Sequence, residues 1–394
     1  MKIRFLLHDV YGRGGGVVTV TFALAEELAK RHDVELISTF GGNRSAVHPL
    51  PAGVPVTSLI QDEGDDQSRP RRLLRGRASK RPSRIIPTAE RRFDQYSRYT
   101  DLVLGRYLRS LGDGVLVTMQ PALNVAAARL GTAGCVRVAQ DHRPFKGRPR
   151  NILENYKEYA GGLDTFLTLT KADAVRYRKL IGDQVPVRAL GNGTPNYEGP
   201  LSTHTNRTVV AAGRLSRTKG FDVLIASWVH VAEQHPDWQL QIWGEGGLRP
   251  ELTQQITDLG LTSQVQLMGF SNQLQEELAQ SSIFVLSSRA EGYPRVILEA
   301  MACGVPVVST DCPSGPREMI ESGVDGLLVP TQDAAALGSA INQMIERGPE
   351  GRREIGLAGL ARARALSQAV VAQRWEKLLS DLSARGEASV KPGS

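Results

Sequence analysis

Three features that assign many proteins to a class are missing or scarce in this chain of 394 residues. No uninterrupted apolar run reaches the roughly 18 residues that a membrane-spanning helix needs. Only three cysteines occur, and none of them forms a Cys-x-x-Cys pair. We therefore expect no transmembrane span, no disulfide framework and no zinc site, and a reducing cytosol fits best. Cys135, Cys303 and Cys312 are predicted to be small buried residues.

Acidic residues are nearly absent between Arg69 and Arg92. Ten lysines and arginines face one glutamate there, so this stretch carries a charge of +9, whereas the whole chain carries +7. Basicity is thus a local feature. Three interpretations stay open: a solvated loop, a contact with an anionic membrane surface, where each basic side chain contributes about 1 kcal/mol, or a contact with a polyanion. Aromatic residues follow only at its end, which makes nucleic acid the weakest of the three.

The remaining composition, 41% hydrophobic and 23% charged, is that of an ordinary globular protein large enough for two domains. Short apolar runs alternate with helical stripes, which indicates parallel sheets with helices on both faces. The first run is broken by His8 and Asp9 and is predicted to be a buried strand rather than a signal peptide. The expected strands are 3–10, 34–39, 114–118, 135–140, 166–170, 185–190, 209–212, 238–243, 264–268, 283–287, 305–310 and 326–329.

A change of composition at residues 191–206, to Gly, Asn, Pro, Ser and Thr, predicts a boundary between two similar halves. We expect an N-terminal Rossmann-like domain at 1–195 with a basic insertion at about 61–92, and a linker at 196–206. A C-terminal domain at 207–366 would follow, and then a helix with a flexible tail at 367–394. The polar residues 383–394 are expected to be frayed.

The most specific motif is Glu291-Gly-Tyr-Pro-Arg-Val-Ile-Leu-Glu299. It follows a predicted buried strand, and Pro294 suits the first position of a helix. A helix start at the carboxyl edge of a parallel sheet binds phosphate groups. Two carboxylates beside it can accept hydrogen bonds from sugar hydroxyls. The competing interpretation is that one glutamate caps the helix and the other lies on the surface.

A basic loop, Gly213-Arg-Leu-Ser-Arg-Thr-Lys-Gly220, follows another predicted strand. Arg214 offers a planar fork for phosphate oxygens, and Lys219 a compact positive charge. Together they could neutralise a diphosphate, while a solvated basic loop is equally compatible with the pattern. Arg217 is expected to face solvent.

Two weaker signals lie in the first half. The glycine-rich loop Gly12–Gly16 permits close backbone approach to a ligand, but its spacing does not fit the dinucleotide fingerprint and no Gly-Lys-Ser/Thr follows. A tight turn without a ligand is the competing interpretation. His142 ends the run Gln140-Asp141-His142 and could bond to a sugar hydroxyl, although a lone histidine is more often structural.

These motifs together resemble those of the family 4 glycosyltransferases, over nearly the whole chain. The Glu-x7-Glu block and then the Gly-Arg-Leu…Lys-Gly block are the most specific parts, and the glycine-rich loop, the histidine loop and Asn192-Gly193 occur in the expected order. The resemblance implies an α/β architecture, the GT-B fold, in which two Rossmann-like domains with doubly wound parallel sheets face a central cleft. The long insertion at 61–92 and Arg143 depart from the usual pattern.

The resemblance also implies roles for single residues. Arg214 and Lys219 would hold the diphosphate, Glu291 the donor sugar, Glu299 the ribose, and His142 would lie near the sugar. The other donor-binding residues that it implies are Gly15, Gly16, Asn192, Gly213, Met268, Gly269, Phe270, Gly292, Tyr293, Pro294, Arg295, Val296 and Ile297.

The implied activity is a retaining transfer of a hexose or N-acetylhexosamine from a nucleotide diphosphate sugar to a hydroxyl acceptor, with UDP the commonest donor nucleotide of the family. The implied setting is the assembly of cell-envelope glycans, glycoconjugates or secondary metabolites, in the cytoplasm and peripherally on the inner face of the membrane. The front-face mechanism of the family needs no general base. The sequence has no Asp-x-Asp motif for a metal, so cationic side chains would stabilise the leaving group, and we expect neither a metal nor a cofactor.

Two other classes stay open. Another enzyme of the same fold, such as a nucleotide-sugar 2-epimerase or a phosphorylase, is one of them. An epimerase would act on the donor without an acceptor. A non-enzymatic nucleotide-sugar-binding protein is the other, and it would bind the donor without turnover.

Overall fold

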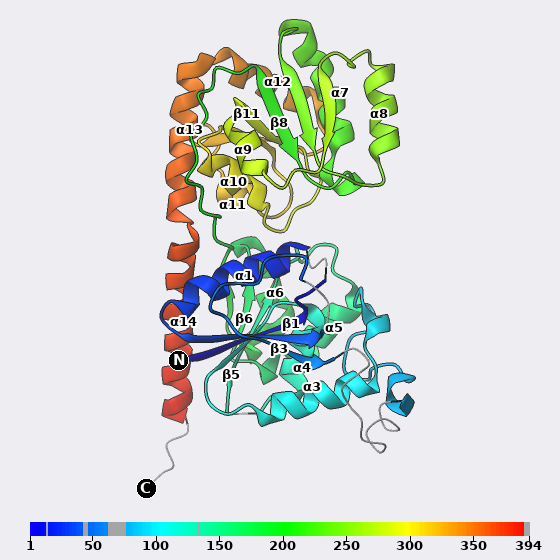
Figure 1. Ribbon diagram of the computed structural model, residues 1–394, viewed down its shortest axis with the longest axis vertical. Helices are drawn as coiled ribbons and strands as arrows, with labels where there is room; N and C mark the ends of the chain where they lie inside the picture. Colours follow the sequence, from blue (N-terminus) through cyan, green and yellow to red (C-terminus); the bar gives the residue numbers. More distant parts are fainter. Residues whose placement is uncertain (13–14, 42–45, 62–75, 133, 390–394) are drawn as a thin grey trace. The chain divides into compact units, whose positions relative to one another are not determined.

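The computed structural model describes residues 1–12, 15–41, 46–61, 76–132 and 134–389. Its contacts divide the chain into two compact units, which we call unit 1 (Met1–Gly193 and Gln368–Ser394) and unit 2 (Thr194–Ser367). Each unit contains one parallel sheet with helices packed around it (Figure 1). Within the described ranges, no helix combines the length and the apolar character that a membrane crossing requires.

The sheet of unit 1 has seven strands in the order β3-β2-β1-β4-β5-β6-β7. The strands are β1 Lys2–Asp9, β2 Asp33–Phe40, β3 Val56–Ile60, β4 Val115–Thr118, β5 Val136–Asp141, β6 Thr165–Thr168 and β7 Val187–Ala189. The helices are α1 Gly15–Ala29, α3 Arg98–Ser110, α4 Pro121–Leu130, α5 Arg150–Tyr159, α6 Lys171–Ile181 and α14 Gln368–Ser389, with short 3-10 turns η1 Phe93–Gln95, η2 Ala160–Gly162 and η3 Gly182–Gln184. Strand β3 was not predicted, because its residues are half-buried at the sheet edge and form no continuous apolar run.

The sheet of unit 2 has six strands in the order β10-β9-β8-β11-β12-β13. The strands are β8 Thr208–Ala212, β9 Gln239–Trp243, β10 Val265–Gly269, β11 Ile283–Leu286, β12 Val307–Thr310 and β13 Gly326–Val329. The helices are α7 Phe221–Gln234, α8 Arg249–Asp258, α9 Leu274–Ala279, α10 Arg295–Ala302, α11 Pro316–Met319, α12 Ala334–Glu346 and α13 Gly348–Ala365, with the 3-10 turn η4 Arg217–Lys219. The order reverses between β8 and β11, and ligands bind outside the carboxyl ends of the strands at such a switch point.

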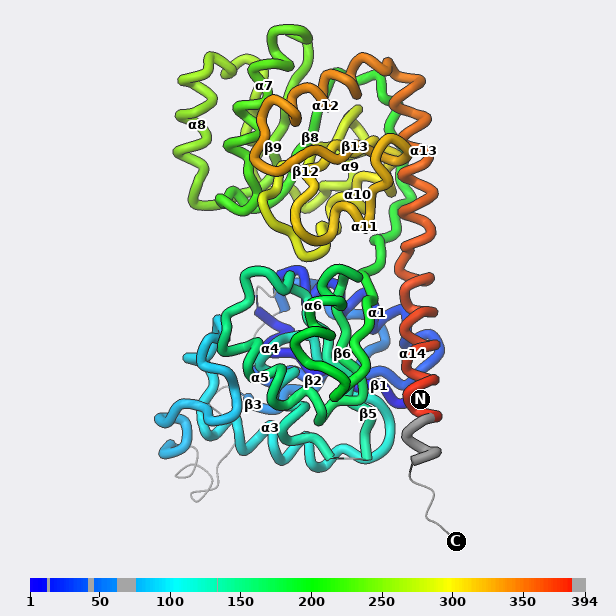
Figure 2. The backbone as a smooth tube through the Cα atoms, turned by 180° about the vertical axis from the view of Figure 1, so that it is seen from behind, coloured from blue at the N-terminus to red at the C-terminus, as the bar shows by residue number. Residues whose placement is uncertain are grey.

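The last helix, α14, packs on unit 1. Trp375 is 1% exposed and lies in one core cluster with Phe5 of β1 and Leu28 of α1. Arg31 at the end of α1 donates to the Glu376 carboxylate at 2.7 Å. Figures 1 and 2 both show α14 beside α1.

Helix α14 is longer than predicted. Residues 383–389 continue it to Ser389, whereas we expected the chain to fray from residue 383; residues 390–394 lie outside the described part of the chain. Ala, Arg and Glu predominate in this segment and are good helix formers, and no proline interrupts them before Pro392.

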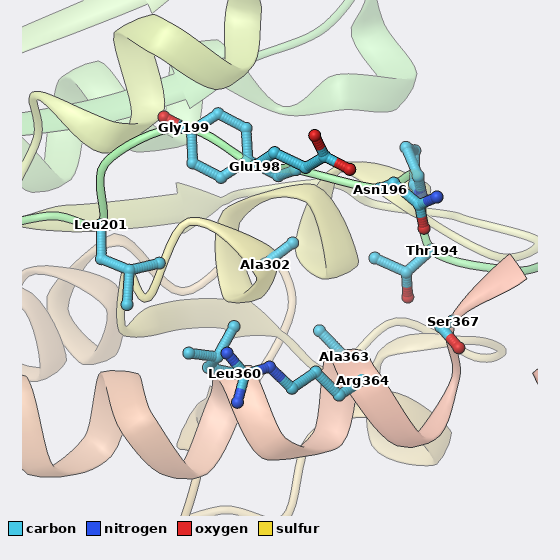
Figure 3. Close-up of a pocket in the computed structure, with 12 residues that line it drawn as sticks. Thr194, Asn196, Glu198, Gly199, Leu201, Ala302, Leu360, Ala363, Arg364 and Ser367 are labelled. Carbon is cyan, nitrogen blue, oxygen red and sulfur yellow. The ribbon is translucent and has the colours of Figure 1, made fainter.

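The chain enters unit 2 at Thr194 and leaves it at Ser367, and these two residues form a parallel bridge. The Thr194 amide donates to the Leu366 carbonyl at 2.8 Å. Figure 3 shows both residues at a cavity of about 450 Å³ between the segment 194–201 and α13. Just before this point, a side chain on Gly193 would overlap Gln368, so the close approach of the two segments requires glycine there.

The described part of the basic insertion is folded onto unit 1. Ile86 and Tyr96 are buried in the core cluster that also contains Leu104 of α3. The Tyr96 hydroxyl lies 2.7 Å from Nδ1 of His8, at the end of β1. Of the three interpretations left open for the basic stretch, a freely solvated loop does not fit residues 76–92, because apolar residues among the arginines anchor this segment; residues 69–75 lie outside the described part.

Trp375→Ala should destabilise unit 1 by about 3–5 kcal/mol, the usual cost of deleting a buried tryptophan side chain. Urea denaturation followed by circular dichroism measures this change. The control is Gln373→Ala, an exposed position on the same helix, where a change below about 0.5 kcal/mol is expected. Equal stability of the two variants would show that α14 is not part of the folded core.

Candidate functional site

The basic loop and the acidic motif meet at the carboxyl edge of the unit 2 sheet. Nζ of Lys219 lies 2.6 Å from Oε1 of Glu291. The Ser288 hydroxyl donates to the same carboxylate oxygen at 2.5 Å. Lys219 follows β8 and Glu291 follows β11, and these strands are neighbours in the sheet. Two motifs 72 residues apart in the sequence therefore form one site.

Glycine at position 220 makes this approach possible. Gly220 has a φ of 65°, and a Cβ there would overlap the Ser287 carbonyl oxygen. Two further bonds tie the loops together: the Arg289 amide donates to the Thr218 carbonyl at 2.8 Å, and the Ser287 hydroxyl donates to the Lys219 carbonyl at 3.0 Å. Any other residue at 220 would be strained and would push the loops apart.

Three basic side chains lie at this edge, and they differ in whether a carboxylate pairs with them. Arg289 donates to both carboxylate oxygens of Asp222 at 2.7 and 2.6 Å, which lowers the pKa of Asp222. Lys219 is paired with Glu291. Arg214 is exposed, and no carboxylate among the described residues pairs with it. Arg214 is therefore available to an anionic ligand, while Arg289 is largely neutralised by Asp222.

The second glutamate of the motif lies on α10. The Glu299 carboxylate is 3.7 Å from the Arg295 guanidinium, and burial raises the pKa of Glu299. Pro294 is the cap residue before α10 rather than the first helical residue that we predicted. The Ile297 amide donates to the Pro294 carbonyl at 3.0 Å, so this predicted phosphate donor is already engaged within the turn.

A cavity of about 350 Å³ lies beside Arg214 at the ends of β8, β9 and β10. Phe270 lines it and is 74% exposed, which is unusual for a large aromatic side chain. Trp243 also lines it, and its buried Nε1 has no hydrogen-bond partner among the described residues. The full lining is Ala212, Gly213, Arg214, Trp243, Gly244, Glu245, Phe270, Ser271 and Leu274.

Six residues of this lining were not predicted to belong to the site: Ala212, Trp243, Gly244, Glu245, Ser271 and Leu274. A signal was present, because the run Gly244-Glu-Gly-Gly247 directly follows the predicted strand 238–243. The structure explains the glycines: Gly244 has a φ of 136°, and its amide donates to the Gly269 carbonyl at 2.6 Å. Met268 is 38% exposed at the end of the adjacent strand.

The carboxyl edge of the unit 1 sheet carries the other predicted residues. His142 follows β5, and its Nε2 lies 3.0 Å from Oε1 of Gln140. Burial lowers the pKa of His142 to about 4, so the ring is neutral at pH 7. The neighbouring Asp141 carboxylate is buried and accepts hydrogen bonds from Arg148, from the Tyr177 hydroxyl and from the Arg143 amide, which fixes the loop that carries His142.

The glycine-rich loop lies at the same edge, after β1. The Asp9 carboxylate accepts hydrogen bonds from the Tyr11 amide at 2.8 Å and the Gly12 amide at 3.1 Å. Gly15 begins α1 with a φ of 55°, and Gly16 follows with open space at its Cα. Asn192 is buried after β7. Residues 13 and 14 lie outside the described part of the chain.

The predicted residues thus form two groups. Arg214, Lys219, Glu291 and Glu299 gather in unit 2 with Gly213, Met268, Gly269, Phe270, Gly292, Tyr293, Pro294, Arg295, Val296 and Ile297. Gly15, Gly16, His142 and Asn192 belong to unit 1. Within the described ranges, no three His, Cys, Asp or Glu side chains form a cluster that could hold a metal ion.

Comparison with known sequences gives the family. Residues 206–347 match the family model described as glycosyl transferases group 1. The chain is also 33% identical to an exopolysaccharide phosphotransferase of Streptomyces coelicolor, over 98% of its own length and 41% of that protein. It therefore spans about two fifths of the length of this relative. Residues 206–347 therefore belong to the group 1 glycosyltransferases, known as family 4.

Solved structures show the same fold. TarM of S. aureus, solved with UDP, fondaparinux and α-GlcNAc-glycerol, has a TM-score of 0.74 at 14% identity, over 96% of this chain and 99% of TarM. Anabaena HepE, solved with UDP, has a TM-score of 0.74 at 20% identity, over 97% of this chain and all of that chain. The predicted fold class, GT-B, is confirmed.

The free energy of unfolding should fall between pH 6.5 and pH 4, in part through His142. The folded chain binds the proton of this residue with a pKa of about 4 and the unfolded chain with a pKa near 6.5, so the unfolded state is protonated first. Its contribution to stability is therefore present above pH 6.5 and lost as the pH falls towards 4. Urea denaturation at pH 7 and pH 4.5 should show a smaller pH effect in His142→Gln than in the wild type. His230→Gln, at an exposed position, is the control, and an unaltered pH effect in His142→Gln would contradict the assignment.

Proposed function

We propose that this chain transfers a hexose or an N-acetylhexosamine from a UDP-sugar to a hydroxyl acceptor, with retention of configuration and without a metal ion. The observation that carries this proposal is the 2.6 Å contact between Lys219 and Glu291 beside the unpaired Arg214, at a switch point of a parallel sheet. Membership of the family supports the reaction, and the UDP found in TarM and HepE supports the nucleotide.

The charges of this site suit a donor with a diphosphate next to a sugar. Arg214 and Lys219 can hold the phosphate oxygens, since both are cations and Arg214 has no competing carboxylate among the described residues. When Lys219 turns to the diphosphate, its present partner Glu291 becomes free to accept hydrogen bonds from sugar hydroxyls. The same contact thus places both side chains where a donor with a diphosphate and a sugar would need them.

The cavity beside Arg214 suits the nucleoside. Phe270 offers an exposed aromatic face for a base, and the buried Nε1 of Trp243 offers a hydrogen-bond donor. Glu299, on α10, would accept hydrogen bonds from the ribose hydroxyls. The cavity volume of about 350 Å³ is at the lower end of the range for small-molecule sites.

The reaction follows from these positions. The bond between the anomeric carbon and the β-phosphate oxygen breaks, and the acceptor oxygen bonds to the same face of that carbon. The acceptor proton passes to an oxygen of the departing phosphate, so no side chain need act as a base. Arg214 and Lys219 stabilise the growing phosphate charge. His142, neutral at pH 7, would exchange hydrogen bonds with a sugar hydroxyl without adding charge.

Arg214→Ala and Lys219→Ala should each lower kcat by about 10²- to 10³-fold, the effect of losing one preorganised charge-stabilising group. Release of UDP in the presence of a UDP-sugar and acceptor measures this. Arg217→Ala is the matched control, because Arg217 is a solvent-exposed residue of the same loop. Wild-type turnover in Lys219→Ala would remove this residue from the mechanism.

Glu291→Gln tests whether the chain is an enzyme or only binds the donor. It keeps the shape of the side chain, so UDP should still raise the melting temperature, while transfer should fall by at least tenfold. Phe270→Ala is the complementary change, which should weaken UDP binding and leave kcat at saturating donor nearly unchanged. If wild-type protein binds UDP-sugars and no acceptor is glycosylated, the transfer proposal fails and the non-enzymatic or epimerase reading replaces it.

Transfer of a sugar phosphate is a second candidate, because the relative that aligns over 98% of the chain is a phosphotransferase. The two reactions leave different nucleotides. Sugar transfer releases UDP, whereas sugar phosphate transfer releases UMP. Separation of the nucleotide products by anion-exchange chromatography therefore decides between them, and we expect UDP.

The acceptor and the location are also proposals. We infer an acceptor of the cell envelope or an exopolysaccharide, and the similarity to the exopolysaccharide phosphotransferase of Streptomyces supports this setting. An acceptor of this kind is presented at the inner face of the membrane, and the basic residues of the stretch from Arg69 to Arg92 would hold the protein on that anionic surface.

A further inference from the structure

Five arginines line a cavity of about 620 Å³ on unit 1, which we call the arginine pocket. Two of its walls come from the folded insertion and from α3. The complete lining is Arg77, Ala78, Arg81, Arg84, Ile85, Arg98, Asp101, Leu102, Arg109 and Leu130. The first three arginines belong to the basic stretch, whereas Arg98 and Arg109 lie beyond it and were not singled out from the sequence.

The positive charge of the arginine pocket is not balanced. No carboxylate among the described residues forms an ion pair with any of the five arginines. Asp101, the one acidic residue of the lining, is engaged by the Ser83 hydroxyl at 2.5 Å and by the Arg84 amide at 2.8 Å. Clustered guanidinium groups repel one another, so an anion in the pocket would be strongly favoured.

The arginine pocket is also apolar. Leu102 is 56% exposed, and Ile85 and Leu130 contribute to the same walls. A ligand that fits this lining carries a phosphate or another anionic group for the arginines and an apolar part for Leu102. A purely polar polyanion would use the charges and leave the leucine exposed to water.

The walls are held in place by contacts within unit 1. Arg129 donates to the carbonyls of Arg84 and Ile85 at 3.2 and 2.9 Å, and its guanidinium lies 4.5 Å from the centre of the Tyr159 ring. On the opposite side, the Arg98 amide donates to the Arg81 carbonyl at 2.9 Å. The segment that carries three arginines is therefore fixed to α3 and α4.

The arginine pocket lies away from the predicted sugar site of unit 1. Arg109 and Leu130 stand at the carboxyl ends of α3 and α4, which lead into β4 and β5. His142 and the glycine-rich loop follow the opposite ends of the strands. A strand of four to eight residues is roughly 13–27 Å long, so a single sugar cannot occupy both places.

We propose that the arginine pocket binds the phosphate headgroup of an anionic lipid in a bilayer, with Leu102 in contact with the apolar layer. This inference rests on the membrane location in the proposed function and assigns the contact to a built cavity rather than to the whole basic stretch. The unbalanced charge attracts the headgroup, and the exposed leucine distinguishes a lipid from a soluble polyanion.

Sedimentation with vesicles of phosphatidylcholine containing 30% phosphatidylglycerol tests the proposal on the full chain. Arg81→Gln and Arg109→Gln should each lower the partition coefficient about fivefold, the factor that corresponds to roughly 1 kcal/mol per basic side chain near an anionic surface. Arg150→Gln is the control, since this arginine on α5 is 91% exposed and outside the arginine pocket. An equal loss in the control would overturn the proposal, and so would equal binding to pure phosphatidylcholine.

Leu102→Ser separates a bilayer from a soluble polyanion. It keeps all the charges, so binding to heparin or polyphosphate should stay at the wild-type level while binding to anionic vesicles falls several-fold. Wild-type vesicle binding by Leu102→Ser, or a loss of heparin binding alone in the arginine variants, would assign the pocket to a polyanion instead.

The melting temperature shift caused by UDP keeps this test apart from the proposed reaction. The shift depends on unit 2 residues, so all pocket variants should retain it. Pocket-dependent vesicle binding without any transfer would contradict the reaction alone. Normal transfer to a water-soluble acceptor without vesicle binding would contradict the lipid site alone.

Discussion

The contact between Lys219 and Glu291 depends on a reversal of strand order. Strand β9 lies on one side of β8 and β11 on the other, so the loops after β8 and β11 open towards each other. Gly220 then lets the two backbones approach until the lysine and the glutamate pair at 2.6 Å. A half-buried pair of this kind costs desolvation and contributes little net stability. Its value lies in holding opposite charges at one place, where a ligand with a diphosphate and hydroxyl groups can replace each partner.

The electrostatic design of the chain is uneven. At the unit 2 edge, Asp222 neutralises Arg289 and Glu291 pairs with Lys219, whereas no carboxylate in the described part of the chain pairs with Arg214. In unit 1, the arginine pocket concentrates five guanidinium groups with almost no compensation, and Asp141 uses its charge internally to fix the His142 loop. Uncompensated charge thus occurs at two separate places, and a neutral histidine stands where a sugar is expected.

Local patterns in the sequence predicted what depends on local chemistry. Residues 283–286 form an unbroken apolar run because β11 is buried on both faces. Residues 213–220 have the glycine-rich and polar composition that is typical of a loop. Three features were not predicted, because they depend on neighbouring elements or on single backbone angles. They are the edge strand β3, the cap position of Pro294 and the continuation of α14. The cavity beside Arg214 was missed in part, because Trp243 joins Arg214 only through the pairing of β8 with β9. The packing of residues 76–92 on the core was not predicted, because Ile86 lies among arginines in the sequence.

The position of α14 has a consequence for synthesis on the ribosome. Because α14 completes the core of unit 1, unit 2 is topologically an insertion between two pieces of that unit. All strands of unit 2 are synthesised before Trp375, so unit 1 lacks its last core helix while unit 2 is made. During that interval the face of unit 1 around Phe5 and Leu28 stays uncovered. The nascent protein therefore carries an open apolar surface on unit 1 until α14 packs on it.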